Sequence, residues 1–302
     1  MILPNVVIAG APKCGTSSIF YWLSDHPKVC TSRVKETFFL MDNGHPLLNK
    51  SCNYHEHGLD GYQTFFSHCD PDCDVILEAT THYIYQQTAL DVLSSLNPVP
   101  QVIFILRKPS DRVYSSFQYT KNNLANLDKT ISFRQFTDII KSERAEPLIN
   151  RLARDSAYVL RNDIKYSRYI DYIPAWVSRF GKERVHVFLF EDMKRDPRTF
   201  MRNLSKRIGI DPGFYEDYDF IPYNETFYIK NQVLHRWIRE IAKLIPQSVF
   251  KGLMKKIYLG IQADKPELTL EDSMTLSGLE CEFRPFNQRL AQELGIDITV
   301  WD

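Results

Sequence analysis

Short apolar runs rich in β-branched residues alternate along the chain with segments of helical periodicity. The apolar runs cover residues 5–10, 74–79, 101–107 and 184–191. Continuous apolar strands are typical of a parallel sheet that is buried on both faces. Apolar residues recur three and four positions apart over residues 16–23, 85–96, 109–120, 167–180 and 197–208, which predicts helices there. The pattern therefore predicts an α/β fold, a three-layer sandwich with a central parallel sheet.

Two long segments interrupt this alternation. Residues 122–165 are rich in charged side chains, and residues 211–272 are rich in Tyr, Phe and Pro. Connections of this length inside a compact domain often form lids or binding segments. Because no repeat or linker-like tract is visible, we expect a single domain over residues 1–302 in which these two segments cover a substrate or cofactor.

Composition and charge narrow the class of protein. Of the 302 residues, 44% are hydrophobic and 25% are charged, as in an ordinary globular protein. Lys and Arg total 37, and Asp and Glu also total 37, so the chain lacks the basic excess of proteins that grip nucleic acids. No apolar run approaches membrane-spanning length, and the first strand begins too close to Met1 for a secretion signal. We expect a cytoplasmic protein that binds neither nucleic acid nor membrane, and the sequence does not indicate its oligomeric state.

The six cysteines form no standard metal motif. Ligand-type residues gather in one stretch, at Cys52, His55, His57, His68, Cys69 and Cys73. Their spacing matches no usual zinc site, so we expect no bound metal and interpret them as free thiols and surface histidines. Cys69 and Cys73 could pair if the chain met an oxidising compartment, which the sequence does not indicate.

The first predicted strand leads into the loop GAPKCGTSS, residues 10–18. Gly10 and Gly15 have the spacing of a nucleotide-triphosphate loop, but that motif needs lysine directly after the second glycine, and here Lys13 lies upstream. The N–H groups of residues 13–18 would converge on an anion, with the positive end of the next helix behind them. The alternative is an ordinary turn before a helix. We predict that the anion is held by Lys13, Cys14, Gly15, Thr16, Ser17 and Ser18.

A second candidate element, RKPSDRVYSSF, covers residues 107–117. Pro109 suits a first helical turn, so we expect Arg107 at the carboxyl edge of the sheet and Ser115 about two turns into the helix. Ligands of open α/β sheets bind at that edge, and an arginine fork beside a hydroxyl suits a terminal phosphate. Taken alone, a solvent-facing Arg with a helix-interior Ser is an equally good interpretation.

Together these two elements resemble the sulfotransferases that depend on 3′-phosphoadenosine-5′-phosphosulfate (PAPS), which have a P-loop-like fold. The loop matches their PK-x-G-T motif, and Arg107, Arg112 and Ser115 match R-x-x-x-x-R-x-x-S. Supporting similarity lies at residues 34–39, 78–85 and 167–197 and at the C-terminal end, closer to the heparan-sulfate-type and bacterial branch than to cytosolic aryl sulfotransferases. The glycine-rich basic loop that many members carry is not evident. Its candidate replacements are Lys230 and Arg236.

The resemblance implies how a donor would be held. The loop would cradle the 5′-phosphosulfate of PAPS, and Arg107 and Ser115 would hold the 3′-phosphate. A sulfuryl group carries less charge than a phosphoryl group, so we expect no required metal. Lys13 would instead neutralise charge on the bridging leaving oxygen.

Two residues compete for the role of general base. Glu36 matches the position of the catalytic glutamate in heparan-type members, and its ordinary pKa of ~4.3 would have to rise by burial near Phe38 and Phe39, against the effect of Lys35. Otherwise it belongs to a surface Lys–Glu pair. His82, at the end of the strand at 74–79, has an ordinary pKa of ~6.5 that already suits proton transfer, although a lone His is as often structural. The resemblance favours Glu36.

The sequence allows two interpretations of the aromatic segment that could bind the acceptor. Residues 213–229 interleave tyrosines and phenylalanines with acids, which suits a cationic or amine-bearing small molecule such as a saxitoxin-like alkaloid. The ordinary interpretation, which we favour, is an aromatic strap that packs on the sheet with its acids facing water. A glycan acceptor of the heparan type is an alternative.

Two other function classes stay open. A P-loop kinase or NTPase would explain the loop but lacks the lysine after Gly15 and should need Mg²⁺. A nucleotide-binding module without catalysis would need Lys13, Arg107 and Ser115 but neither Glu36 nor His82.

Overall fold

The computed structural model describes the chain except for residues 125, 143–153, 224–227, 230–262 and 265–267. The chain divides into two compact units. The first comprises Met1–Lys108, Arg168–Asn224 and Phe283–Asp302, and the second comprises Pro109–Ser167 and Glu225–Glu282. Of the two segments predicted to cover a ligand, residues 122–165 belong to the second unit, whereas residues 211–224 belong to the first. A single domain over residues 1–302 stays a prediction.

A five-stranded parallel sheet, with strand order β2-β3-β1-β4-β5, lies at the centre of the first unit. The strands are β1 (Val6–Gly10), β2 (Val29–Thr31), β3 (Val75–Ala79), β4 (Gln101–Leu106) and β5 (Val185–Leu189). The four predicted strands are confirmed, and every residue of β1 is buried, as a central strand requires. The sequence did not indicate β2, because three residues at a sheet edge carry no recognisable pattern.

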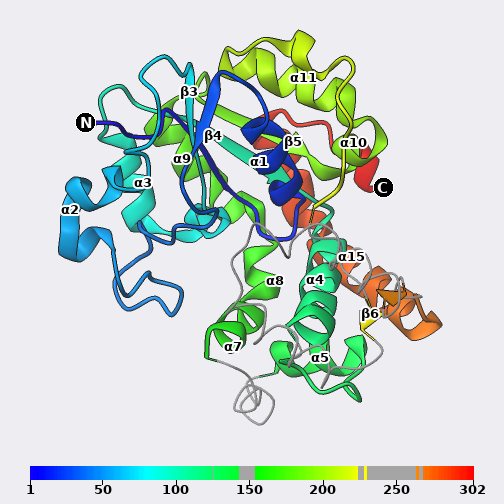
Figure 1. Cartoon of the computed structure of the whole chain (residues 1–302). Helices are drawn as coiled ribbons and strands as arrows, with labels where there is room; N and C mark the ends of the chain where they lie inside the picture. The colour runs from blue at the N-terminus through cyan, green and yellow to red at the C-terminus, as the bar shows by residue number, and fades with distance from the viewer. Residues whose placement is uncertain (125, 143–153, 224–227, 230–262, 265–267) are drawn as a thin grey trace. The chain divides into compact units, whose positions relative to one another are not determined.

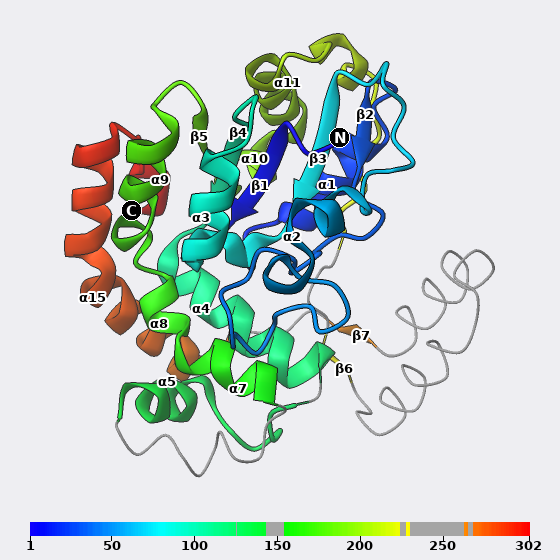
Figure 2. The same cartoon turned by 90° about the vertical axis from the view of Figure 1, so that its left-hand side faces the viewer.

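Helices cover both faces of this sheet (Figures 1 and 2). On one face lie α3 (Gln87–Ser94) and α9 (Ile173–Phe180), and on the other lie α1 (Thr16–Ser24) and α11 (Pro197–Ile208). Neighbouring strands supply aromatic contacts to opposite faces: Phe104 of β4 meets Trp176 of α9, and Phe188 of β5 meets Phe200 of α11, with ring centroids 5.5 and 5.3 Å apart. The three-layer prediction is therefore confirmed.

One predicted helix is wrong in extent. Residues 167–180 form a short 3₁₀ turn, η3 (Tyr169–Asp171), and then α9. Pro174 lies in the first turn of α9, where its missing N–H costs nothing, but it could not continue a helix that began upstream. The smaller elements of the first unit are α2 (Tyr54–Gln63), η1 (Thr81–Tyr85), α10 (Phe190–Arg195), η4 (Pro212–Tyr215) and η5 (Thr299–Trp301).

The second unit is mainly helical. Its elements are α4 (Pro109–Gln118), the π-helical turn η2 (Tyr119–Asn123), α5 (Phe133–Lys141), α7 (Arg154–Arg161), α8 (Asp163–Tyr166), β6 (Tyr228–Ile229) and β7 (Ala263–Asp264). Residues 270–282 of the long helix α15 (Leu270–Leu294) also belong to it, and residues 283–294 belong to the first unit. Among the described helices, none combines the length and the apolar character needed to cross a bilayer.

Arg112 of the predicted phosphate motif has a structural role in the second unit. Its side chain is fully buried, and Nη1 donates to the Asp163 carboxylate at 3.2 Å and to the Ser167 hydroxyl at 2.9 Å. A buried guanidinium needs such partners, and here they join α4 to α8 and the residue that follows it.

The interpretation of these cysteines as free thiols is wrong for Cys69, and its partner is not Cys73, the one that the sequence suggested for an oxidising compartment. Cys69 forms a disulfide with Cys30, at a Cα–Cα distance of 5.6 Å and a sequence separation of 39 residues. Cys30 lies in the middle of edge strand β2, and the turn after α2 returns the chain beside it, because Arg33 N–H donates to Phe65 O at 3.0 Å. Cys73 is a free thiol.

Candidate active site

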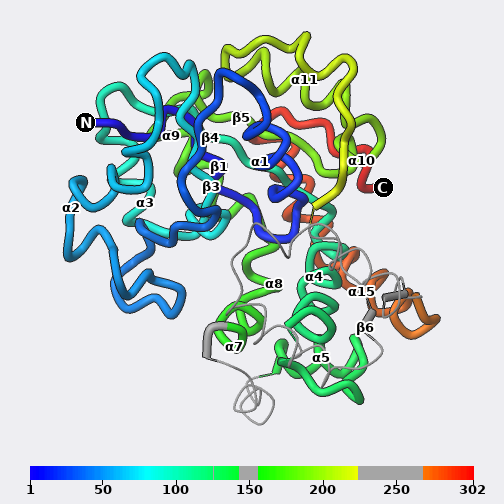
Figure 3. Tube along the Cα trace, in the orientation of Figure 1, coloured from blue at the N-terminus to red at the C-terminus, as the bar shows by residue number. Residues whose placement is uncertain are grey.

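The loop of residues 11–15 joins the buried end of β1 to the first turn of α1, as the chain path in Figure 3 shows. Ala11 N–H donates to Ile105 O at 2.9 Å, which fixes the loop to β4. Lys13 has φ of 69°, in the left-handed region that disfavours residues with a Cβ. Such a conformation costs about 1 kcal/mol or more, and residues held in it cluster at functional sites. The strained residue of this loop is its lysine.

The N-terminus of α1 is suited to an anion. Its N-cap residue, Gly15, has no side chain that could cap the first helical N–H groups. Thr16 is buried and Ser17 is half-buried at this end. Ser18 differs from the prediction, because its N–H donates to Gly15 O at 3.0 Å and its hydroxyl accepts from Tyr223 N at 2.9 Å. We therefore leave Ser18 out of the candidate cradle.

The Cys14 thiol contributes to the support of the loop. The side chain is fully buried, and Sγ lies 3.7 Å from the Tyr169 hydroxyl. The same hydroxyl donates to Arg107 O at 2.9 Å and accepts from Arg107 N at 3.5 Å. Tyr169 therefore ties the loop to the end of β4.

Arg107 lies at that end, as predicted, and its guanidinium stacks over the Phe190 ring at 4.9 Å. Within the described residues, its Nε is buried without a hydrogen-bond partner, which is costly unless a ligand supplies one. Glu191 supports the neighbouring backbone, because its carboxylate accepts from Lys108 N at 2.9 Å and from the Trp301 indole at 2.9 Å.

Phe190 also contacts the loop. A Cβ added to Gly15 would lie 2.7 Å from Phe190 Cδ2 and 2.7 Å from Met193 Cε, so the loop packs directly on α10. Gly15 and Arg107 thus share one aromatic side chain. Sequence reasoning missed Phe190, Tyr169 and Glu191; the only signal was that they lie in or beside the similar segment at 167–197.

Replacing Gly15 by alanine tests this packing. Gly15 has φ of 77° and Gly44 has φ of 78°, but no described atom lies within 4 Å of a Cβ built on Gly44. We expect Gly44→Ala to cost only backbone strain, about 1 kcal/mol, and Gly15→Ala to cost a further ~1–3 kcal/mol from overpacking. Urea unfolding of both variants measures the difference; equal losses would mean that Phe190 and Met193 do not confine the loop.

The two candidate bases lie together at the carboxyl end of β3. Glu36 N–H donates to Ala79 O at 2.9 Å, and Glu36 and Phe38 both have positive φ, 62° and 50°. The Glu36 carboxylate accepts from Thr81 N and from the Thr81 hydroxyl, each at 3.0 Å, and from Lys35 Nζ at 2.5 Å. The expected rise in the pKa of Glu36 is wrong. Burial raises it, but the charges of Lys35 and His82 and the hydrogen bonds from Lys35 and Thr81 bring this pKa below its ordinary value.

His82 lies in η1 directly after this strand, with its ring 6.2 Å from that of Phe38. Its charge lowers the pKa of Glu36, so the two groups are electrostatic neighbours. The end of β1, from which the loop starts, is next to η1, since a Cβ on Gly10 would lie 2.9 Å from Ile84 Cβ. Lys13, Glu36, His82 and Arg107 therefore all belong to the carboxyl edge of the sheet, where α/β proteins bind ligands. Ser115, half-buried on α4, belongs to the second unit, and its pairing with Arg107 stays a prediction.

Sequence reasoning also missed Glu78, a fully buried acid in β3 beneath this edge. Its Oε1 accepts from the Thr37 hydroxyl at 2.9 Å and from the Thr80 hydroxyl at 2.6 Å. In the described part of the chain, its Oε2 is buried with no hydrogen-bond partner. Burial therefore raises the pKa of Glu78 to about 7, although hydrogen bonds from Thr80 and Thr37 oppose the rise. Thr37 lies between the two residues of positive φ, so Glu78 holds the turn that carries Glu36.

The raised pKa of Glu78 makes stability depend on pH. The unfolded carboxyl loses its proton above its ordinary value of 4.5, whereas the folded one keeps it until about 7, so stability falls as pH rises through this window. The full loss is about 3 kcal/mol. We expect Glu78→Gln, which cannot ionise, to gain most of this amount relative to the unsubstituted protein between pH 5 and pH 8 in urea unfolding. Exposed Glu56→Gln is the control, and parallel pH profiles for all three proteins would contradict the account.

The aromatic segment after α11 packs against the protein with its acids facing water, as the ordinary interpretation predicted, but it packs on α1 and not on the sheet. Tyr215 is fully buried and donates to Trp22 O at 3.0 Å, and the Trp22 indole donates to Ile221 O at 3.0 Å. The Tyr218 hydroxyl donates to Asp25 at 2.5 Å. The acids of this segment, Glu216, Asp217 and Asp219, are exposed. The segment packs on α1, and Lys230 and Arg236 lie outside the described residues.

The chain is similar to several known proteins. The mouse (Mus musculus) bifunctional heparan sulfate N-deacetylase/N-sulfotransferase 4 is 24% identical over 218 residues, and the human (Homo sapiens) enzyme 3 is 26% identical over 214 residues. Each alignment covers 70% of this chain but 23% of the relative, so the chain spans about a quarter of the length of these curated relatives. The crystal structure of a sulfotransferase from Alicyclobacillus acidocaldarius, 21% identical, superposes with a TM-score of 0.66 over 100% of this chain and 99% of that one.

The structural similarity confirms the predicted P-loop-like fold. The family model described as "Sulfotransferase domain" matches residues 3–231, well over half of the chain. This chain therefore belongs to the sulfotransferase domain family.

Proposed function

We propose that this chain transfers the sulfuryl group of PAPS to a hydroxyl or amine of an acceptor. One observation carries the proposal: the loop bearing Lys13 and the Arg107 side chain both pack on Phe190 at one sheet edge, and Arg107 keeps a buried Nε with no partner among the described residues. An uncapped helix N-terminus with an ammonium beside it suits the phosphosulfate, and a guanidinium fork suits a terminal phosphate.

Each residue then has a defined task. PAPS, when bound, supplies the sulfuryl group and a 3′,5′-bisphosphate leaving group. The N–H groups at the start of α1 and Lys13 would hold the 5′ end, with the Lys13 ammonium neutralising charge at the bridging oxygen. Arg107, together with Ser115, would hold the 3′-phosphate. Glu36 would take the proton from the attacking hydroxyl or amine, and its lowered pKa keeps it ionised and ready for that step.

The acceptor is proposed only by its reacting group. The aromatic rings that suggested a cationic, saxitoxin-like molecule pack on α1, so that idea has lost its main support. The relatives that carry the name heparan sulfate N-sulfotransferase favour an amine-bearing glycan as the alternative acceptor. A small-molecule acceptor, independence from metal and a cytoplasmic location stay predictions.

Calorimetry tests the donor site without an acceptor. We expect 3′,5′-ADP to bind in the presence of EDTA and Mg-ATP to bind far more weakly, because no lysine follows Gly15. Arg107→Lys keeps the charge but loses the fork, so it should weaken 3′,5′-ADP binding by roughly 10-fold or more. Mg²⁺-dependent binding of ATP without binding of 3′,5′-ADP would favour a kinase or NTPase and overturn the proposal.

A further inference from the structure

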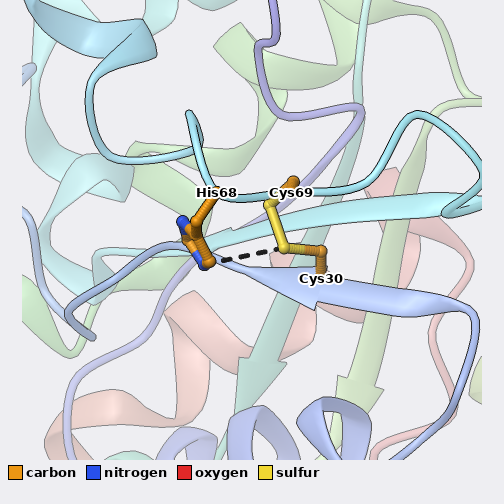
Figure 4. Close-up of side chains that lie close together, drawn as sticks. All are labelled: Cys30, His68 and Cys69. Carbon is orange, nitrogen blue, oxygen red and sulfur yellow. Dashed lines mark hydrogen bonds between the residues drawn. A yellow bond between two sulfur atoms is a disulfide. The ribbon is translucent and has the colours of Figure 1, made fainter.

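A second cluster of reactive side chains lies away from the sheet edge just described. Cys30, His68 and Cys69 bring two sulfur atoms and an imidazole nitrogen within 4.8 Å of one another (Figure 4). Cys30 comes from edge strand β2, and His68 and Cys69 come from the turn after α2. The two sulfurs are bonded to each other, and His68 Nε2 lies 3.7 Å from Cys30 Sγ.

The two sulfurs differ in their access to solvent. Cys69 is only 5% exposed, whereas Cys30 is partly exposed and His68 is exposed. An external thiolate therefore reaches Cys30 Sγ more easily than Cys69 Sγ, and access decides which sulfur of a disulfide is attacked. An imidazolium beside Cys30 would stabilise the Cys30 thiolate when Cys30 leaves in the second exchange step.

We propose that Cys30, Cys69 and His68 form a thiol–disulfide exchange site for a dithiol reductant, and that its oxidation state controls the order of the segment carrying Glu36. A thiolate of the reductant attacks Cys30 Sγ, the Cys30–Cys69 bond breaks, and Cys69 leaves as a thiolate that takes up a proton. The second thiol of the reductant then attacks the mixed disulfide, releases Cys30 beside His68 and becomes part of the oxidised reductant. Two electrons pass from the dithiol to the protein, and the two protons lost by the reductant's thiols, directly or through solvent, complete the two new cysteine thiols.

The link to Glu36 is short and continuous. After β2, Ser32 N–H donates to Leu77 O at 2.8 Å, and Arg33 contacts the turn twice, through N–H to Phe65 O at 3.0 Å and through Nη2 to the Ser67 hydroxyl at 3.2 Å. Glu36 then begins the turn of positive φ that needs support from its surroundings. Breaking the disulfide removes the covalent tie between β2 and residues 65–69, so local opening of this segment becomes easier.

A metal site is the rival interpretation of the same three side chains. Zinc binds thiolates, and the structure has a disulfide in their place, so the bonded form offers no thiolate ligand. The oxidised pair beside an exposed histidine favours exchange.

Hydrogen exchange and thiol counting test the inference directly. Dithiothreitol should open the Cys30–Cys69 bond in the folded protein, with mass spectrometry after alkylation locating two new thiols, and exchange over residues 32–39 should rise by about tenfold or more. His68→Gln should slow the opening by roughly threefold to tenfold without preventing it. The inference is overturned if reduction requires unfolding, or if exchange over residues 32–39 is the same in both states.

Two variants serve as controls. Cys73→Ser removes a nearby free thiol and should leave the redox response intact. The double variant Cys30→Ser, Cys69→Ser should show the faster hydrogen exchange of the reduced native protein both with and without dithiothreitol. The effect on turnover rests on the proposed function: reduction should lower transfer by the native chain and not by the double variant. If reduction speeds hydrogen exchange but the chain never transfers a sulfuryl group, the proposed function is refuted and the proposed thiol–disulfide exchange site is still supported.

Discussion

Replacing Lys13 by alanine is expected to lower turnover by ~10²–10³, because the ammonium that neutralises the leaving oxygen is lost. The fold should persist, since Lys13 lies in a loop and is only half-buried. Steady-state kinetics with PAPS and thermal unfolding of the same samples separate the two effects.

Lys13→Gly makes this test sharper. Glycine relieves the strain of φ at 69° and should stabilise the loop by about 1 kcal/mol, yet it removes the same ammonium. We expect a variant that is as inactive as Lys13→Ala but more stable than it. The exposed Lys28→Ala is the charge-matched control and should retain full activity. Activity that survives in Lys13→Gly would mean that the loop needs only its backbone conformation.

The second large effect is expected at Glu36. Glu36→Gln keeps the size and can still accept a hydrogen bond from Thr81, but it cannot take a proton, so turnover should fall by ~10²–10⁴. The assignment is reversed if this variant keeps near-normal turnover while His82→Ala is inactive.

The pH profile separates the two bases without mutation. Because the pKa of Glu36 lies below its ordinary value of 4.5, its carboxylate should stay ionised, and kcat/KM should stay flat, from neutral pH down to about 5.5, one unit above that ordinary value. With a histidine base, kcat/KM would instead fall as the pH drops through the ordinary histidine pKa of ~6.5. Loss of activity centred there would assign the proton transfer to His82.

Sequence patterns determined most of the fold and only part of this site. Strands such as Gln101–Leu106 are easily predicted, because a strand that is buried on both faces is a continuous run of apolar residues. The predicted strand at 184–191 extended two residues beyond the end of the observed strand, Val185–Leu189. Phe190 continues the apolar run but begins α10, where Glu191 and Asp192 favour the positive end of the helix.

At the site, the loop and the strand end were predictable because each is a local motif. Their supports were not, because Phe190 and Tyr169 reach Arg107, and Glu191 reaches Lys108, only through tertiary contacts. The pKa of Glu36 is lowered first by the charge of Lys35, which the sequence placed beside it, but also by His82 and Thr81, some 45 residues away in the chain. Glu78 carried no signal, since an acid inside an apolar strand is buried or exposed according to neighbours that the sequence does not specify.

Transfer of the sulfuryl group itself tests the central claim most directly. The chain is incubated with PAPS and a panel of hydroxyl- and amine-bearing acceptors, including small phenols, cationic alkaloids and N-deacetylated heparan oligosaccharides, and products are weighed by mass spectrometry. We predict that one acceptor class gains the mass of SO₃, with release of an equal amount of 3′,5′-ADP, and that Lys13→Ala lowers both by ~10²–10³. PAPS that is bound but left intact with every acceptor, or consumed equally by Lys13→Ala, would contradict the account.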